Sequence, residues 1–189
     1  MSERNTFIRS LHDIGVAAWF GGSLMGAIGL NGGAAAAKDP AERLRVSSAG
    51  WAKWTPVQLA AIAVHGVGGI GLIVANKGRI AAQGEAKSNT AIKTVVTAAA
   101  GAASVISGLA GAAIAKHADE GGSGVTEPGA GSSSDALKKA QSVEKVTQWA
   151  IPLLTGVLIV LGAQQGEQQR PAAGWLGSIG SKAKSAVGR

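Results

Sequence analysis

The sequence contains no cysteine and no tyrosine, and it is poor in charged and aromatic residues. The missing cysteine excludes disulfides, thiolate catalysis, iron–sulfur clusters and cysteine-based zinc sites. Charged residues make up only 15% of the 189 residues, whereas a soluble domain carries about 25%. Aromatic residues make up 4%, too few for the large side chains that fill a water-soluble core. The chain is therefore short of both a solvated surface and a soluble core.

The residues present in excess are small and apolar. Hydrophobic residues make up 46% and 29 residues are glycine, and glycine and alanine let helices approach closely in lipid. Four stretches lack any charge, and each is close to the roughly 20 residues that a helix needs to cross a bilayer. These stretches are Ile14–Ala37, Thr55–Asn76, Thr94–Ala115 and Val146–Gly166.

The sequence therefore predicts an all-α protein, a bundle of four transmembrane helices. We expect a membrane domain over residues 1–170, followed by a basic tail over residues 171–189. The tail is either an amphipathic helix in the headgroup layer or disordered. The four spans are expected at about residues 10–34, 55–76, 92–116 and 143–166.

Lysine and arginine in the connections favour a plasma (cytoplasmic) membrane protein with both termini in the cytoplasm. The net charge of +7 is spread over several connections and both ends. Nucleic-acid binding requires a clustered basic face, so we expect the lipid bilayer as partner and no nucleic acid. The first apolar stretch is too long for a cleaved signal peptide, and we interpret it as a retained anchor.

Two connections carry recognisable local signals. Asp39, Pro40 and Glu42 form a helix start, which predicts a short interfacial helix from Pro40 to about Ala49. Trp51 and Trp54 follow it and, with Trp175 in the tail, are predicted interface anchors. The third connection, over residues 117–134, has the glycine and serine content of a flexible linker.

Glycines recur at helical spacing on the predicted spans. Gly66 to Gly71 match G-x-G-x-x-G literally, but a dinucleotide site needs this motif between a strand and a helix, and here it lies inside an apolar span. We interpret these residues as helix-packing positions. The predicted packing set is Gly22, Gly26, Gly29, Gly33, Gly66, Gly68, Gly69, Ser104 and Gly108.

His65 lies halfway along the second span, where ionisable residues are costly. It could bind haem or copper, or relay protons. The alternative is a neutral histidine bonded to a backbone carbonyl or to a hydroxyl on a neighbouring helix, and the candidate hydroxyls are Ser23, Ser104, Ser107 and Thr155.

His12 is a second possible metal ligand, at the start of the first span. It should lie near the membrane surface, whereas His65 should lie roughly 15 Å deeper. The sequence therefore predicts that the two histidines do not share a metal. No set of nucleophile, base and acid is recognisable, so we expect no enzymatic activity.

The segment Leu11–Gly22 (LHDIGVAAWFGG) resembles the start of copper-resistance-D-type four-helix membrane proteins, which often begin with a histidine, small residues and Trp-x-Gly-Gly. The resemblance covers about one span. It implies a helical bundle with a metal-handling role and makes His12 a candidate ligand. The composition also resembles that of small multipass membrane proteins of high-GC actinobacteria.

The leading functional expectation is a structural or accessory membrane subunit, packed against other subunits or against itself through glycine-lined helix faces. The alternative is binding or transport of haem, metal or protons at His65.

Overall fold

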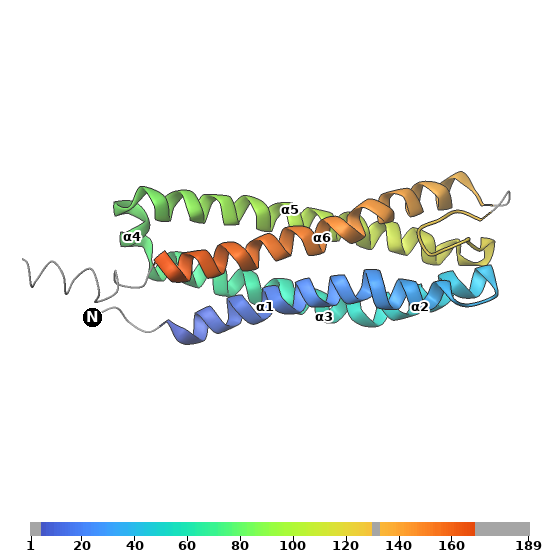
Figure 1. Cartoon of the computed structure of the whole chain (residues 1–189), viewed down its shortest axis with the longest axis horizontal. Coiled ribbons are helices and arrows are strands. Elements are labelled where there is room, and N and C mark those ends of the chain that lie inside the picture. The colour runs from blue at the N-terminus through green and yellow to red at the C-terminus, as the bar shows by residue number, and fades with distance from the viewer. Residues whose placement is uncertain (1–4, 130–132, 169–189) are drawn as a thin grey trace, which may run out of the picture.

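Four long antiparallel helices form an elongated bundle, and the chain reverses at the two ends of the bundle (Figure 1). The computed structural model describes residues 5–129 and 133–168. Four helical segments in this part are long and apolar enough to cross a membrane, which confirms the predicted all-α membrane bundle. The helices are α1 (Thr6–Met25), η1 (Gly26–Leu30, a π turn), α2 (Asn31–Ala35), α3 (Pro40–Ala75), α4 (Lys77–Ala82), α5 (Gly84–Lys116), η2 (Ala118–Glu120) and α6 (Asp135–Gln168).

Large apolar side chains face outward and several polar side chains are buried. Ile70, Leu109 and Leu153 are 66%, 69% and 69% exposed, whereas Gln141 and Thr155 are fully buried. In water this arrangement would be unfavourable, because exposed apolar area costs about 25 cal/mol per Å². In a bilayer the apolar surface meets hydrocarbon and the polar groups find their partners inside the bundle.

Helices α1 and α3 approach each other closely because each helix places a glycine against the backbone of the other. A Cβ added at Gly15 would lie 2.5 Å from the backbone nitrogen of His65, and one added at Gly68 would lie 2.5 Å from that of His12. Both distances are too short for any side chain, so the two glycines set the separation of the helices. Gly68 was a predicted packing residue, whereas Gly15 was not.

The rings of Trp51 and Trp54 pack against glycines of η1 and α1. A Cβ at Gly26 would meet the Trp51 ring and one at Gly22 the Trp54 ring, both within 2.5 Å. The two glycines thus pack as predicted, but against indole rings rather than against a helix backbone. Both tryptophans therefore pack between helices. Their predicted role as interface anchors stays a prediction. Trp175, the third predicted anchor, lies outside the described residues.

Four predicted packing positions have no neighbouring helix in the described structure. Nothing lies within 4 Å of a Cβ added at Gly33, Gly66 or Gly108, and at Gly29 only the nearby Met25 side chain does. The remaining two make contacts: Gly69 lies 3.4 Å from the His12 ring, measured from the added Cβ, and Ser104 accepts a hydrogen bond from Trp19.

The prediction of a separate interfacial helix in the first connection is wrong. A helix does begin at Pro40, with the Asp39 side chain accepting from Ala41 N at 2.9 Å, as the sequence indicates. However, it continues without a break to Ala75. Leu44 and Ser47 are buried within the bundle, so packing extends α3 through the segment that was expected to bend away.

The described part of the third connection folds as a cap on the bundle rather than as a free linker. Gln141 of α6 donates to the carbonyl oxygens of Val125 and Glu127 at 3.1 and 3.2 Å. Arg43 of α3 donates to those of Gly122 and Ser123 at 3.2 and 2.9 Å. The donors belong to helix side chains outside the connection. The glycine and serine content of the connection therefore could not predict that it is held in place.

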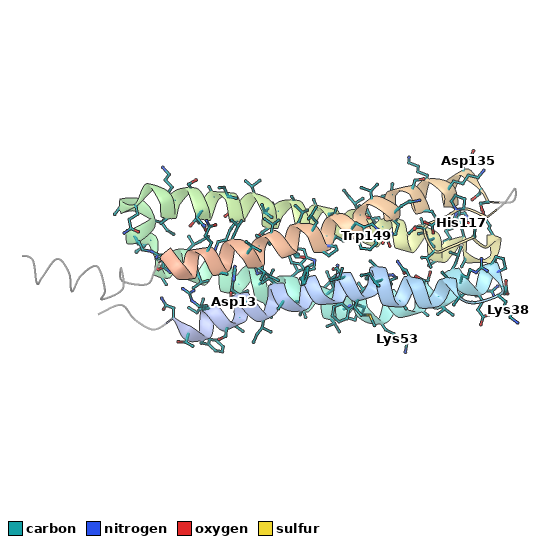
Figure 2. The ribbon with its side chains drawn as sticks, in the orientation of Figure 1. Asp13, Lys38, Lys53, His117, Asp135 and Trp149 are labelled. Atoms are coloured by element: carbon teal, nitrogen blue, oxygen red, sulfur yellow. The ribbon has the colours of Figure 1, made fainter. Side chains whose placement is uncertain are left out.

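The two ends of the bundle differ in their loops. The start of α1 and the end of α6 lie at the same end (Figure 1), as expected for four spans. Figure 2 places Asp13 toward this end and Lys38, His117 and Asp135 at the opposite, capped end. Residues 169–189, which carry the predicted amphipathic or disordered tail, lie outside the described residues.

A matched pair of glycine substitutions tests the α1–α3 contact. Gly15→Ala should lower the free energy of unfolding in mixed micelles by about 1–3 kcal/mol, because the new methyl group overlaps backbone. Gly33→Ala should leave it unchanged or raise it by up to about 1 kcal/mol, because the site is open and alanine favours helix. Equal effects at the two positions would contradict the close approach.

Acidification should loosen the cap through Glu120. The Ser134 backbone N–H and the His117 ring donate to its carboxylate, and these hydrogen bonds lower the pKa of Glu120 below its ordinary value of 4.5. A lowered folded-state pKa means that this stabilisation is complete above pH 4.5 and is lost as pH falls through the lower folded value.

Hydrogen exchange of residues 117–129, corrected for intrinsic rates, should therefore show less protection at about pH 3 than at about pH 6. Glu120→Gln should lower the protection at the higher pH and remove most of the pH dependence. A wild-type cap whose protection is the same at both pH values would refute the role of Glu120.

Candidate functional site

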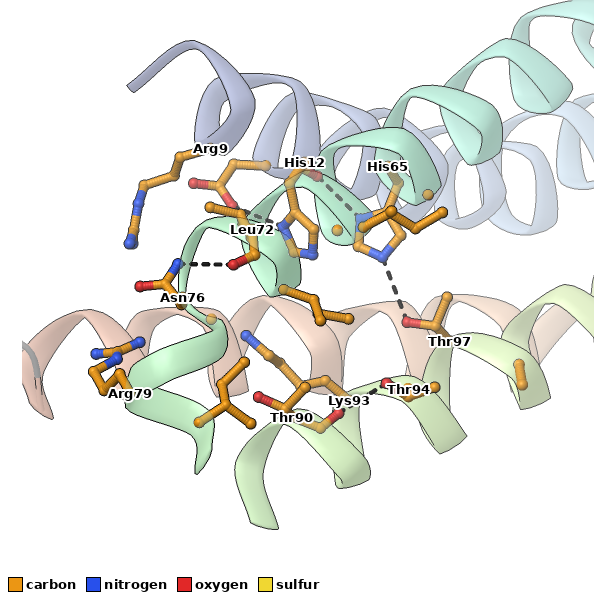
Figure 3. A pocket seen from close by; sticks show the side chains of 18 residues that line it. Arg9, His12, His65, Leu72, Asn76, Arg79, Thr90, Lys93, Thr94 and Thr97 are labelled. Atoms are coloured by element: carbon orange, nitrogen blue, oxygen red, sulfur yellow. Dashed lines mark hydrogen bonds and ion pairs between the residues drawn. The ribbon is translucent and has the colours of Figure 1, made fainter. Parts of the chain in front are cut away.

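A chamber of about 340 Å³ opens near the end of the bundle where the described chain begins and ends (Figure 3). Its wall combines residues from α1, α3, α4 and α5, and Gly162 of α6. The polar side chains of the wall are Arg9, His12, Asp13, His65, Asn76, Arg79, Thr90, Lys93, Thr94 and Thr97.

His12 and His65 lie against each other at the inner part of this chamber. Their ring centroids are 4.1 Å apart and their planes are inclined by 40°. The predicted depth difference of roughly 15 Å between them is therefore wrong, whereas the prediction that they do not share a metal stays a prediction. The depth difference assumed that position along one helix gives depth in the bundle, but α1 runs antiparallel to α3 and the glycine contacts set the offset between them.

Hydrogen bonds fix the proton on Nδ1 of both rings in their neutral forms. His65 Nδ1 lies 3.0 Å from the His12 carbonyl oxygen, which can only accept. His12 Nδ1 lies 3.1 Å from a carboxyl oxygen of Asp13. Each Nε2 atom is then the proton-accepting atom, and that of His65 lies 3.4 Å from the Thr97 hydroxyl. Any further proton would be taken up at Nε2.

This pattern agrees in kind with the non-metal interpretation of His65 but not with its named partners. A backbone carbonyl and a hydroxyl do hold the ring, yet they belong to His12 and Thr97 rather than to Ser23, Ser104, Ser107 or Thr155. Thr97 was not a candidate, because the sequence does not give the register of α5 against α3.

The described wall of the chamber is rich in cationic side chains. Arg9, Arg79 and Lys93 line it together with one carboxylate, Asp13, and Figure 3 shows Lys93 pointing toward the space beside the His12 ring. The Nε atom of Arg79 is buried and has no hydrogen-bond acceptor. A buried donor without an acceptor costs about 1–3 kcal/mol, so an acceptor bound in the chamber would be stabilising.

A second and larger cavity, of about 640 Å³, lies between α3 and α5 in the half of the bundle nearer the cap. Glu144 of α6 forms part of its wall and is only 5% exposed. Its carboxylate accepts from the Ser107 hydroxyl at 2.9 Å and from the Thr147 hydroxyl at 3.3 Å. Glu144 lies within the fourth predicted span, at about residues 143–166, and α6 carries it into the bundle. Its carboxylate was not among the predicted site residues.

Asn31 joins three helices beside this cavity. Its amide oxygen accepts from Ser47 at 2.8 Å and from the Trp51 indole at 2.9 Å. Its amide nitrogen donates to Gln148 at 2.9 Å. A buried amide with these three hydrogen bonds fixes α2, α3 and α6 in one register. Sequence reasoning missed it, since one asparagine in an apolar stretch carries no periodic signal.

A layer of apolar side chains separates the two cavities. Trp19 is fully buried and packs with Ala61, Ala100 and Ile151. On α3, Gly66 lines the chamber and Ile62 lines the larger cavity, so about one helical turn, or 6 Å, lies between them. Trp19 touches both sides: its ring lies 6.2 Å from that of His65 and its indole donates to Ser104 at 3.1 Å.

The chamber is a poor match to the predicted haem or copper site. Within the described residues, no three His, Cys, Asp or Glu side chains are grouped to hold a metal ion. Cationic side chains also line the chamber, and they repel a metal cation. The Nε2 atom of His65, which would ligate the haem iron, faces the Thr97 hydroxyl at 3.4 Å. This chemistry instead favours an anion.

Comparison with known proteins adds no relative. No family model, no curated protein and no solved structure matches the chain. The resemblance of Leu11–Gly22 to copper-resistance-D-type proteins therefore stays a prediction.

Proposed function

We propose that this chain is a multipass protein of the plasma membrane that binds an anion in the chamber at His65, with both termini in the cytoplasm. The observation that carries the proposal is the buried Arg79 Nε without an acceptor, in a wall that also contains Arg9 and Lys93. A guanidinium group binds carboxylate and phosphate oxygens by directed, charge-assisted hydrogen bonds. Basic residues at this end of the bundle also favour its cytoplasmic placement.

The histidine pair would couple anion binding to proton uptake. A proton added at Nε2 of His65 or His12 places positive charge at the chamber wall, and histidine changes charge between about pH 5 and 8. The charged groups that face the pair are Arg9 and Asp13 from α1, Arg79 from α4 and Lys93 from α5; α6 contributes Gly162. Anion affinity should therefore rise as the pH falls.

The anionic group has two possible sources, a soluble anion or the phosphate of a lipid headgroup. Both present the same oxygen chemistry to Arg79. The chamber is lined in part by α4, which lies at one end of the bundle (Figure 1), where either source can reach it. Haem and metal binding are not part of this proposal.

The predicted accessory-subunit role is a second candidate. It is favoured by Gly33, which lines neither cavity and has nothing within 4 Å of an added Cβ. An open glycine face allows a further helix to pack closely in lipid. Chemical crosslinking in native membranes should then give a species larger than the monomer, and Gly33→Leu should remove it.

The anion proposal is tested by ligand-dependent stability. The protein in neutral detergent should be stabilised by phosphate or carboxylates at constant ionic strength, and more at pH 6 than at pH 8. An anion that binds the folded state adds about 2.7 kcal/mol at 100 times its Kd. In nanodiscs, a protein that is more stable in phosphatidylglycerol than in phosphatidylcholine would instead identify the lipid headgroup as the source of the anionic group.

The matched variants are Arg79→Gln and Lys53→Gln. Both remove one positive charge, but Arg79 lines the chamber, whereas Lys53 is exposed and points away from the bundle (Figure 2). Arg79→Gln should abolish the anion effect and Lys53→Gln should retain it. Stability that is insensitive to both soluble anions and anionic lipid, or equally sensitive in the two variants, would disprove the proposal.

A further inference from the structure

We propose that the cavity at Glu144 is a second binding site, one that takes a lipophilic organic cation. This site is separate from the chamber at His65, and it does not depend on the anion proposal.

The first observation is the state of Glu144 itself. The described residues that line the cavity include no Lys, Arg or His, so no cationic side chain of this wall compensates the carboxylate. Two hydroxyl groups, of Ser107 and Thr147, donate to it. Burial of a carboxylate without a cationic partner is costly, and a bound cation would offset that cost.

The second observation is an unsatisfied polar group on another wall of the cavity. Ser23 of α1 lines the cavity and is 3% exposed, and its hydroxyl has no hydrogen-bond partner. A buried hydroxyl normally finds a partner. Ser23 lies on α1 and Glu144 on α6, so the wall formed by each helix contributes one polar side chain, a hydroxyl and a carboxylate, to the same cavity.

The remaining wall selects for an apolar ligand body. Leu59, Ile62 and Val105 line it, and the Trp51 ring contributes an aromatic surface suited to a cation–π contact. The cavity volume of about 640 Å³ falls within the roughly 300–1,000 Å³ of small-molecule sites. The cavity therefore fits one organic cation, and a hydrated metal ion would leave the apolar wall unused.

The cavity also reaches the outer surface of the bundle. Leu59 of α3 and Val105 of α5 line it and are 61% and 64% exposed. A ligand could therefore enter between α3 and α5 from the bilayer, where lipophilic cations accumulate. Entry through the capped end is less direct, since Val125 of the cap lines the cavity and is buried.

A pair of probes of equal shape and opposite charge tests the site. Radiolabelled tetraphenylphosphonium should bind the full chain in detergent at pH 8, whereas tetraphenylborate should not. Glu144→Gln should weaken phosphonium binding at least about tenfold, because the charge-assisted interaction is lost. Glu42→Gln, an exposed change outside the cavity, should bind like the wild type. Lowering the pH should weaken binding, because a proton competes with the cation for the carboxylate.

A chemical measurement on the wild-type chain covers the case in which Glu144→Gln does not fold. Dicyclohexylcarbodiimide should modify Glu144, detected by mass spectrometry, and tetraphenylphosphonium should protect it while tetraphenylborate should not. Equal binding of both ions, or phosphonium binding that survives in folded Glu144→Gln, would show a merely hydrophobic cavity and overturn the proposal. Absence of both binding and protection would overturn it as well.

Discussion

The contact between α1 and α3 sets the geometry on which both cavities depend. Gly15 and Gly68 face the backbone of the opposite helix at distances that no side chain could occupy. This close approach brings the His12 carbonyl within hydrogen-bond distance of His65 Nδ1 and places the two imidazole rings in contact. A wider separation would leave a buried histidine without an acceptor, at a cost of about 1–3 kcal/mol.

The interior is then divided by charge. The chamber near the chain ends is lined by cationic side chains, the larger cavity holds a buried carboxylate, and the layer around Trp19 lies between them. Opposite charges on the two sides of one apolar layer favour different ligands at the two sites.

The fold was largely predictable from the sequence, whereas the sites were only partly so. Long charge-free stretches require transmembrane helices because lipid leaves backbone groups no other partner. Register between helices has no such local signal: His12 beside His65, Thr97 beside His65 and Ser107 beside Glu144 all depend on how four helices slide against one another. Glu144 was not predicted as a site although it lies at the start of the fourth predicted span, because its contact with Ser107 depends on the register of α6 against α5.

Solid-state NMR of the protein in bilayers measures the central contact most directly. With ¹⁵N-labelled histidine and ¹³C-labelled carbonyl groups, magnetisation should pass between His65 Nδ1 and the His12 carbonyl carbon, whose oxygen lies 3.0 Å from that nitrogen. The account predicts this cross-peak in the wild type and its loss in Gly15→Leu. A His65 ring with no transfer to His12 and with water as its partner would contradict the helix register on which both proposed sites rest.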